Sequence, residues 1–175
     1  MWRLLRLGVL LPSAFGLGGC GGVPKVERDP GPLLQTSDLR YSFERLDIGY
    51  SASIPYEFRN RTGGNVYLRN CDGDVRPLLQ VQRDGRWVDA WQPLTAGCES
   101  FPLVIRPGVT FVDTLRVLGA PPGSNVMPAF VFEDVEGIYR LLWFQAVSEY
   151  DPEHPETSTP LRLEHSVSNA FALTS

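Results

Sequence analysis

The stretch ASIPYEFR, residues 52–59, decides the fold class of this chain. Its apolar residues Ile54, Tyr56 and Phe58 alternate with Pro55, Glu57 and Arg59. This two-residue period is typical of a strand with one buried face and one wet face. From residue 41 onward, other short segments rich in valine, isoleucine and aromatic residues show the same pattern. The pattern predicts an all-β domain built as an antiparallel sandwich or barrel.

Outward from this stretch, apolar runs and turn residues succeed each other at fairly regular intervals. Asp84-Gly85 lies between two such runs and is a strong signal for a two-residue hairpin turn. No helical period persists over about twelve residues without proline or glycine, and strand–helix alternation is absent, which excludes parallel α/β folds. We expect strands near residues 41–48, 52–59, 65–70, 77–83, 86–91, 101–105, 109–117, 128–133, 137–147 and 167–173.

The N-terminus has the three parts of an export signal. A short start with two arginines is followed by an apolar run from Leu7 to Leu17, and small residues precede Cys20. This order is typical of a signal peptide. The apolar run is shorter than the about 20 residues that a transmembrane helix needs, so we predict that residues 1–19 are removed.

The residues Leu17-Gly18-Gly19-Cys20 resemble the lipobox of bacterial lipoproteins. The resemblance implies cleavage between Gly19 and Cys20, a diacylglyceryl group on the Cys20 thiol and acylation of the new amino terminus. Two or three acyl chains attach a protein lastingly to a membrane, whereas a single chain does so only marginally. The alternative is cleavage by an ordinary signal peptidase at these small residues, with Cys20 incidental.

Residues 20–39 form the expected link between the membrane and the folded domain. Three prolines, several glycines and charged residues occur there, a composition that predicts a flexible tether. We therefore expect a signal peptide over 1–19, a lipidated cysteine and tether over 20–39, and one domain over 40–175. Gly21, in place of an aspartate, resembles lipoproteins that leave the inner membrane. This implies the periplasmic face of the outer membrane, or the cell surface in a host with one membrane.

Charge and cysteine content indicate which classes of partner and site are compatible with this chain. After residues 1–19 are removed, 14 basic and 20 acidic side chains remain, a formal charge of −6. This balance argues against nucleic acid, whose binding depends on basic side chains that neutralise phosphates. Two further cysteines, Cys71 and Cys98, fit an exported protein, and we predict that they form a disulfide. A metal or catalytic site is disfavoured because neither has a CxxC partner or a nearby histidine.

Four segments of the chain carry short strand and turn motifs. They are residues 54–67, with an Asn-x-Thr turn between two strands; Asp84-Gly85-Arg86-Trp87; residues 105–109, with a Pro-Gly turn; and residues 137–141, with the pattern Gly-x-Tyr-Arg-Leu. These segments resemble bacterial extracytoplasmic immunoglobulin-like domains, in which a strand like 137–141 often closes the sandwich. The resemblance implies an immunoglobulin-like β-sandwich over 40–175 and a role in adhesion, scaffolding or protease inhibition. The Cys-Trp-Cys spacing of antibody domains is absent.

Few residues are suited to catalysis. Histidine, the usual base near neutral pH, occurs only at His154 and His165, without a nucleophile elbow, an HExxH motif or a phosphate loop. The acidic segment 149–156 could hold a metal ion, but two prolines stiffen it and a solvated loop is favoured. Residues 133–136 are interpreted as a turn. We predict no enzyme, no cofactor and no metal site.

Three tryptophans, Trp87, Trp91 and Trp143, are candidates for a binding platform. Trp87 and Trp91 differ by an even number of residues, so on one regular strand they would share a face. A place in the core is favoured for all three, because large aromatic side chains contribute most when buried.

The sequence predicts a lipid-anchored binding module whose partner is an envelope protein, a peptide or a glycan. One alternative is a protease-inhibitor module that presents Ala120-Pro121-Pro122-Gly123-Ser124 to an active site. The other is a metal-dependent hydrolase that uses residues 149–156.

Overall fold

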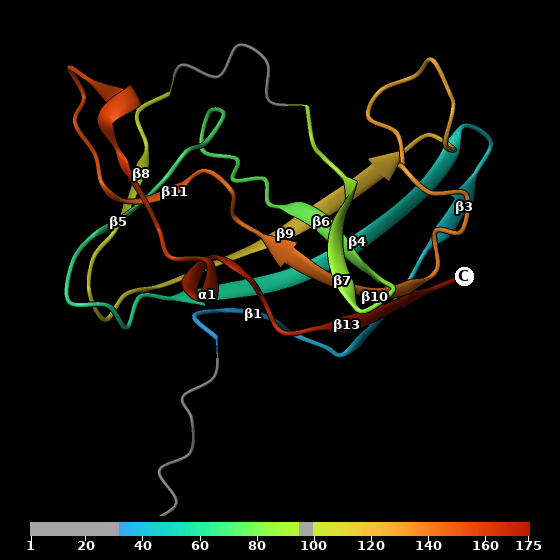
Figure 1. Cartoon of the computed structure of the whole chain (residues 1–175), viewed down its shortest axis with the longest axis horizontal. Helices are drawn as coiled ribbons and strands as arrows, with labels where there is room; N and C mark the ends of the chain where they lie inside the picture. The colour runs from blue at the N-terminus through green and yellow to red at the C-terminus, as the bar shows by residue number, and fades with distance from the viewer. Residues whose placement is uncertain (1–31, 95–99) are drawn as a thin grey trace, which may run out of the picture. The chain divides into compact units, whose positions relative to one another are not determined.

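Strands dominate the computed structural model of this chain, which describes residues 32–94 and 100–175 (Figure 1). Over these residues the predicted all-β class is confirmed, and the strands pair mostly antiparallel. Helical structure in the described residues is limited to a 3₁₀ turn, η1 (Pro155–Thr157), and one short helix, α1 (Leu163–Ser166). Neither is long and apolar enough to cross a bilayer.

The longest strand, β4 (Gly49–Arg59), is the centre of the first sheet. Two short strands, β1 (Leu34–Thr36) and β3 (Glu44–Leu46), pair with opposite ends of one edge of β4. The other edge pairs with β9 (Thr110–Gly119) in an unbroken antiparallel register, from Tyr50 opposite Gly119 to Arg59 opposite Thr110. In Figure 1 these two long strands run side by side across the domain.

The second sheet has the strand order β2-β13-β10-β6-β7. Strands β6 and β7 form the predicted hairpin: Asp84 and Gly85 have φ angles of +50° and +73°, as a two-residue turn with a matching twist requires. Strand β2 pairs with β13 in parallel, and the other neighbours are antiparallel. The bounds are β2 (Arg40–Ser42), β6 (Leu78–Arg83), β7 (Arg86–Trp91), β10 (Gly137–Leu142) and β13 (Phe171–Thr174).

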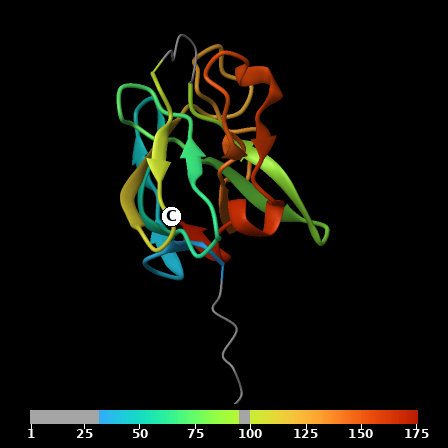
Figure 2. The ribbon, with the colours of Figure 1, turned by 90° about the vertical axis from the view of Figure 1, so that its left-hand side faces the viewer.

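A smaller sheet of order β12-β11-β5-β8 extends the domain at one end (Figure 1). It consists of β5 (Val66–Leu68), β8 (Leu103–Ile105), β11 (Ala146–Glu149) and β12 (Thr159–Pro160). Figure 2 shows the two main layers, with the β4–β9 sheet on the left and the β6–β7 hairpin on the right.

The core fills the space between these layers and confirms the alternation of residues 52–59. Ile54, Tyr56 and Phe58 are at most 1 % exposed, whereas Glu57 and Arg59 are exposed. Trp143 packs in the same core, with its ring centroid 4.7 Å from that of Phe58. The opposite layer contributes buried side chains from three strands, Leu79, Val81, Tyr139, Leu141, Phe171 and Leu173.

The domain begins before residue 40, so the predicted extent of the tether is wrong at its C-terminal end. Leu34 is fully buried, and Leu33 is nearly so. Leu34 lies opposite Phe58 in the β1–β4 ladder, and the Leu33 carbonyl accepts a hydrogen bond from Arg59 N. The apolar pair therefore joins the core. The predicted signal peptide, Gly19, Cys20 and the predicted tether up to residue 31 lie outside the described residues.

Three predicted strands differ from the structure because the chain changes sheet or makes only isolated backbone pairing. Residues 41–48 divide at buried Phe43 into β2 and β3, which belong to different sheets. Residues 137–147 divide after β10, where Trp143 turns inward and Ala146 N bonds to its carbonyl. Residues 128–133 form no strand: Ala129 makes only an isolated bridge with Ala120. The 137–141 segment lies within its sheet and does not close it, since β10 has neighbours on both sides.

Candidate functional site

Strand β9 has one strand partner among the described residues, and that partner occupies only one of its two edges. Asn60 N donates to Val109 O at 3.0 Å, so odd-numbered residues of β9 direct their backbone groups toward β4. Even-numbered residues direct theirs the other way. Consistently, the Leu118 carbonyl accepts a hydrogen bond from the Trp91 indole at 3.1 Å on the outer side. The backbone groups of Val112 and Arg116 meet no partner strand in the described chain.

The side chains of β9 alternate between a buried face and an exposed face. Leu115 and Val117 are 3 % and 2 % exposed and belong to the core. Val112 and Leu118, on the opposite face, are 69 % and 47 % exposed. The open edge therefore combines available hydrogen-bonding groups with apolar side chains beside them.

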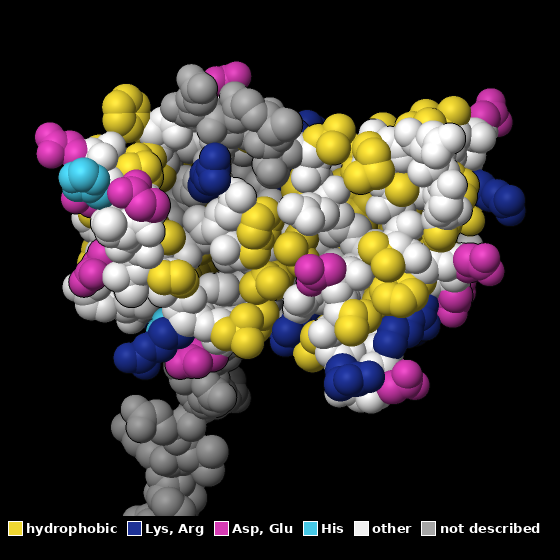
Figure 3. Space-filling view, turned by 45° about the horizontal axis from the view of Figure 1, so that its top comes forward, with side chains coloured by type: hydrophobic (Ala, Val, Ile, Leu, Met, Phe, Trp, Pro, Cys, Tyr) yellow, Lys and Arg dark blue, Asp and Glu magenta, His cyan; other side chains and the backbone are white. Residues whose placement is uncertain are grey.

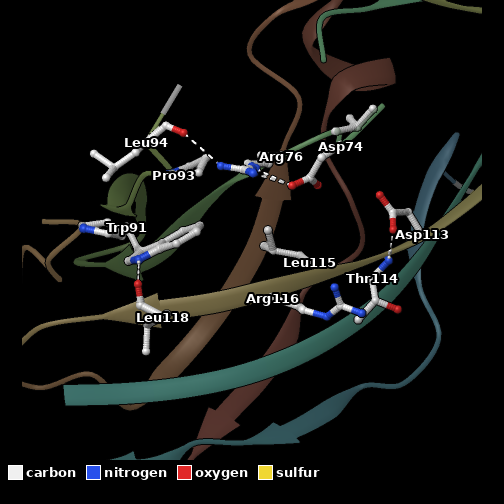
Figure 4. Close-up of a pocket in the computed structure, with 12 residues that line it drawn as sticks. Asp74, Arg76, Trp91, Pro93, Leu94, Asp113, Thr114, Leu115, Arg116 and Leu118 are labelled. Atoms are coloured by element: carbon white, nitrogen blue, oxygen red, sulfur yellow. Dashed lines mark hydrogen bonds and ion pairs between the residues drawn. The ribbon is translucent and has the colours of Figure 1, made fainter. Parts of the chain in front are cut away.

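A groove of about 290 Å³ follows this edge (Figure 4). Its far wall consists of residues 74–76 and the segment from Trp91 to Leu94. Arg76 holds this wall together: its Nε donates to Asp74 Oδ2 at 2.6 Å, and its Nη1 donates to the Leu94 carbonyl at 3.2 Å. The groove is therefore bounded by β9 on one side and by a hydrogen-bonded wall on the other.

Charges of both signs line the groove. Asp74 and Asp113 are opposed by Arg76 and Arg116, so the lining has no net charge. Asp113 is fixed by two donors, Thr114 N at 2.7 Å and the Tyr56 hydroxyl at 3.3 Å. Burial raises the pKa of Tyr56, and the nearby Asp113 carboxylate raises it further, so this hydroxyl stays protonated and able to donate.

Hydrophobic side chains form a broken band on the face of the domain seen in Figure 3. Acidic and basic side chains are interspersed with it, and on this face the described residues form no extended patch of one sign.

The tryptophans do not form a shared platform. A bulge in β7 leaves Ala90 without a partner residue on β6, since Leu79 lies opposite Trp91 while Gln80 lies opposite Asp89. The bulge shifts the alternation by one residue, so Trp91 is 3 % exposed while Trp87 is only partly buried. The prediction that Trp87 and Trp91 share a face is wrong because it assumed a regular strand.

The predicted disulfide stays a prediction because Cys98 lies outside the described residues. Cys71 is described, and hydrogen bonds beside it reach the segment that follows Cys98. Asn70 Nδ2 donates to Phe101 O at 2.7 Å, and Asp72 N donates to Ser100 Oγ at 3.0 Å. These bonds bring the neighbours of both cysteines close together, which supports the pairing.

The acidic segment 149–156 directs its polar groups into local contacts. Glu149 accepts a hydrogen bond from Thr159 Oγ1 at 2.8 Å, and Asp151 accepts one from Glu153 N at 2.9 Å. His154 Nδ1 lies 3.4 Å from Glu156 Oε1. Across residues 32–94 and 100–175, no three potential metal ligands come together. The absence of catalysis and of cofactors stays a prediction.

Two other predicted segments are turns. Asp134 Oδ1 accepts a hydrogen bond from Glu136 N at 3.2 Å, which agrees with the interpretation of residues 133–136. In the 120–124 segment, Ser124 N donates to Pro121 O at 3.2 Å, and Gly123 has a φ of +76°. This local turn gives the inhibitor hypothesis no support, and that hypothesis stays untested.

Sequence reasoning missed the groove because its two walls are far apart in the chain. Residues 74–76 and 91–94 precede β9 by about twenty to forty positions, and only the folded chain brings them together. The length of the 109–117 segment was the one available signal, since a long strand beside a single partner leaves a long edge. Comparison with protein-family models finds none that matches this chain, and comparison with curated proteins finds no significant match.

Proposed function

We propose that this chain is a lipid-anchored protein of the bacterial cell envelope whose immunoglobulin-like domain binds an extended segment of a partner polypeptide along the open edge of β9. The membrane part of the proposal is supported by the lipobox-like residues before Cys20. The binding part depends on one observation, the unpartnered outer edge of a ten-residue strand lined by a groove.

Strand order supports the immunoglobulin-like part of the proposal. In such domains two antiparallel layers contain the second and fifth strands on one side, and the third, sixth and seventh on the other. Here β4 and β9 form one layer, and β6, β10 and β13 lie together in the other. Tyr139, near the start of β10, donates its hydroxyl to the Val135 carbonyl at 2.6 Å, as in the tyrosine corner of this fold.

An open edge is normally a liability, because it offers a template for unwanted strand pairing. Many binding domains use the same feature by adding a peptide as an extra strand, whose main chain gives affinity while alternate side chains give specificity. The β9 edge suits a peptide with apolar residues at alternate positions, which would contact Val112 and Leu118. The opposed charges in the groove favour a segment that carries both an acidic and a basic residue.

Site-specific photocrosslinking in cells tests the binding part. A photoreactive amino acid is placed at Val112 or at Leu118 on β9, and the control position is Val131, which is 61 % exposed and lies outside β9. We expect both β9 positions to crosslink to one partner segment, about six residues apart, because paired strands advance together. Equal crosslinking from Val131, or attachment points without this spacing, would contradict the proposal.

A proline substitution distinguishes loss of binding at the β9 edge from loss of folding. Arg116→Pro removes an outward-facing amide and should abolish crosslinking while the domain stays folded, because edge strands tolerate proline on their free side.

The membrane part is tested by the intact mass of the native protein compared with Cys20→Ser. An unmodified Cys20 would overturn that part without affecting the crosslinking result.

A further inference from the structure

A second cavity lies in the smaller sheet, and it shares no lining residue with the β9 groove. It is bounded by β5, β11 and the η1 segment and has a volume of about 560 Å³. This value lies within the range of roughly 300–1,000 Å³ that small-molecule sites occupy. The cavity is therefore large enough for a ligand of its own.

Aromatic rings provide its apolar surface. The rings of Tyr67 and Tyr150 lie 5.8 Å apart at an angle of 33°, and Tyr67 pairs across the sheet with Val147. All three residues line the cavity. Phe101 lies in the chain between two further lining residues, and its 82 % exposure is the highest among the large hydrophobic side chains described. An aromatic surface is thus available both in the cavity and next to it.

Planar polar side chains surround these rings. Arg69, Gln145 and Glu156 line the cavity, and each presents two or more hydrogen-bonding atoms in one plane. The Ser158 hydroxyl at the same wall is buried and has no hydrogen-bond partner in the described residues. A buried hydroxyl without a partner is unfavourable, so a ligand that satisfies it gains affinity.

We propose that this cavity binds a saccharide. A sugar ring has apolar C–H faces that stack on aromatic side chains, and neighbouring hydroxyls that suit paired donors and acceptors. A purely apolar ligand would make no use of the hydrogen-bonding groups of Arg69, Gln145 and Glu156. An anionic ligand would meet Glu156, whose charge opposes that of Arg69. A neutral polyhydroxylated ring satisfies both the aromatic and the polar lining.

Calorimetric titration of the full mature chain with chitotetraose, cellotetraose and maltotetraose tests the proposal. We expect at least one of these neutral oligosaccharides to bind, and Tyr150→Ala to weaken it by about tenfold, the loss expected when a stacked ring is removed. Glu156→Gln, which keeps the side chain's shape, should weaken binding by a smaller factor. Trp87→Ala is the matched control, because this aromatic residue is partly exposed in another sheet and should leave binding unchanged.

The outcomes are decisive. Absence of binding by all three oligosaccharides at millimolar concentration overturns the proposal. So does binding that survives both Tyr150→Ala and Glu156→Gln. If Tyr150→Ala does not fold by circular dichroism, Tyr150→Leu and Glu156→Gln take its place, and loss of affinity without loss of structure supports the site. Leu118→Ala, in the β9 groove, should not change saccharide affinity, which keeps this inference separate from the proposed function.

Discussion

Strands β7 and β9 both lie at the outer side of a main layer, yet they end their sheets differently. Strand β7 has six residues and a bulge at Ala90, whereas β9 has ten residues in unbroken register with β4. Short length and bulges are two ways in which proteins block pairing at a sheet edge. Strand β9 has neither of these features.

The side chains on the two strands follow the same division. On β7, Asp89 accepts a hydrogen bond from Gln80 Nε2 at 2.8 Å, and the Arg140 guanidinium lies over the Trp87 ring. On β9, Val112 and Leu118 are 69 % and 47 % exposed. The shorter, bulged strand β7 is the less favourable edge for strand addition, so we expect binding only at β9.

The largest expected effect compares two leucines on β9 itself. Leu115→Ala removes a buried side chain from the core and should lower the free energy of unfolding by about 2–5 kcal/mol. Leu118→Ala changes an exposed side chain of the groove and should change stability by no more than about 0.5 kcal/mol. Urea unfolding followed by tryptophan fluorescence measures both.

In binding, the exposed Leu118 should matter although its substitution hardly affects stability. Leu118→Ala should weaken photocrosslinking from Val112, because an apolar contact in the groove is lost. If Leu118→Ala destabilises the domain as much as Leu115→Ala, then the outer face of β9 is part of the core, and the comparison with β7 fails.

Local patterns predicted the parts of the fold that depend on neighbouring residues. The alternation in residues 52–59 identified the inward face of β4, and Asp84-Gly85 identified the β6–β7 hairpin. Both signals act within a few residues, since side-chain period and turn conformation are local properties. The predicted range 109–117 likewise lies close to β9, Thr110–Gly119.

Features that depend on distant partners were not predictable in the same way. The bulge at Ala90 is defined by how Leu79 and Gln80 lie opposite β7, and no single-strand pattern shows it. Strand β1 follows a proline-rich segment, yet it pairs because β4 has a free edge there. The groove combines both kinds of information: the sequence predicted its strand, but neither the open edge of that strand nor the second wall.

A smaller effect concerns a buried tyrosine in each main layer. Burial raises the pKa of Tyr139 to about 12 from its ordinary value of 10.0. The unfolded chain therefore loses this proton at lower pH than the folded chain does. The resulting stability is fully present below pH 10 and falls as the pH rises to about 12, by roughly 2–3 kcal/mol in total.

The Tyr139→Phe variant should lose this part of the alkaline destabilisation, which urea unfolding between pH 9 and about 12 measures. Some pH dependence should remain, because burial also raises the pKa of Tyr56 in the other layer. The variant therefore distinguishes the two layers by their titration. An unchanged pH profile in Tyr139→Phe would show that the Tyr139 hydroxyl is not held neutral by burial.

The smallest expected effect tests the protection of β7. The Arg140 guanidinium lies 4.5 Å from the centre of the Trp87 ring, and its Nε donates to Gln80 Oε1 at 2.8 Å. Burial lowers the pKa of Arg140, but an arginine stays charged at neutral pH. A double-mutant cycle of Arg140→Ala and Trp87→Ala should give a coupling energy of about 0.5–1 kcal/mol, as for a partly exposed cation–π pair.

Arg140→Lys is the control in this cycle. It keeps the positive charge but replaces the planar group that covers the ring, so it should retain only part of the coupling. A coupling energy near zero would mean that Arg140 does not hold the Trp87 face closed. The bulge at Ala90 would then be the main feature that protects β7. Deleting Ala90 would restore a regular register, and we would expect it to open this edge as well, because bulges interrupt the pairing on which strand addition depends.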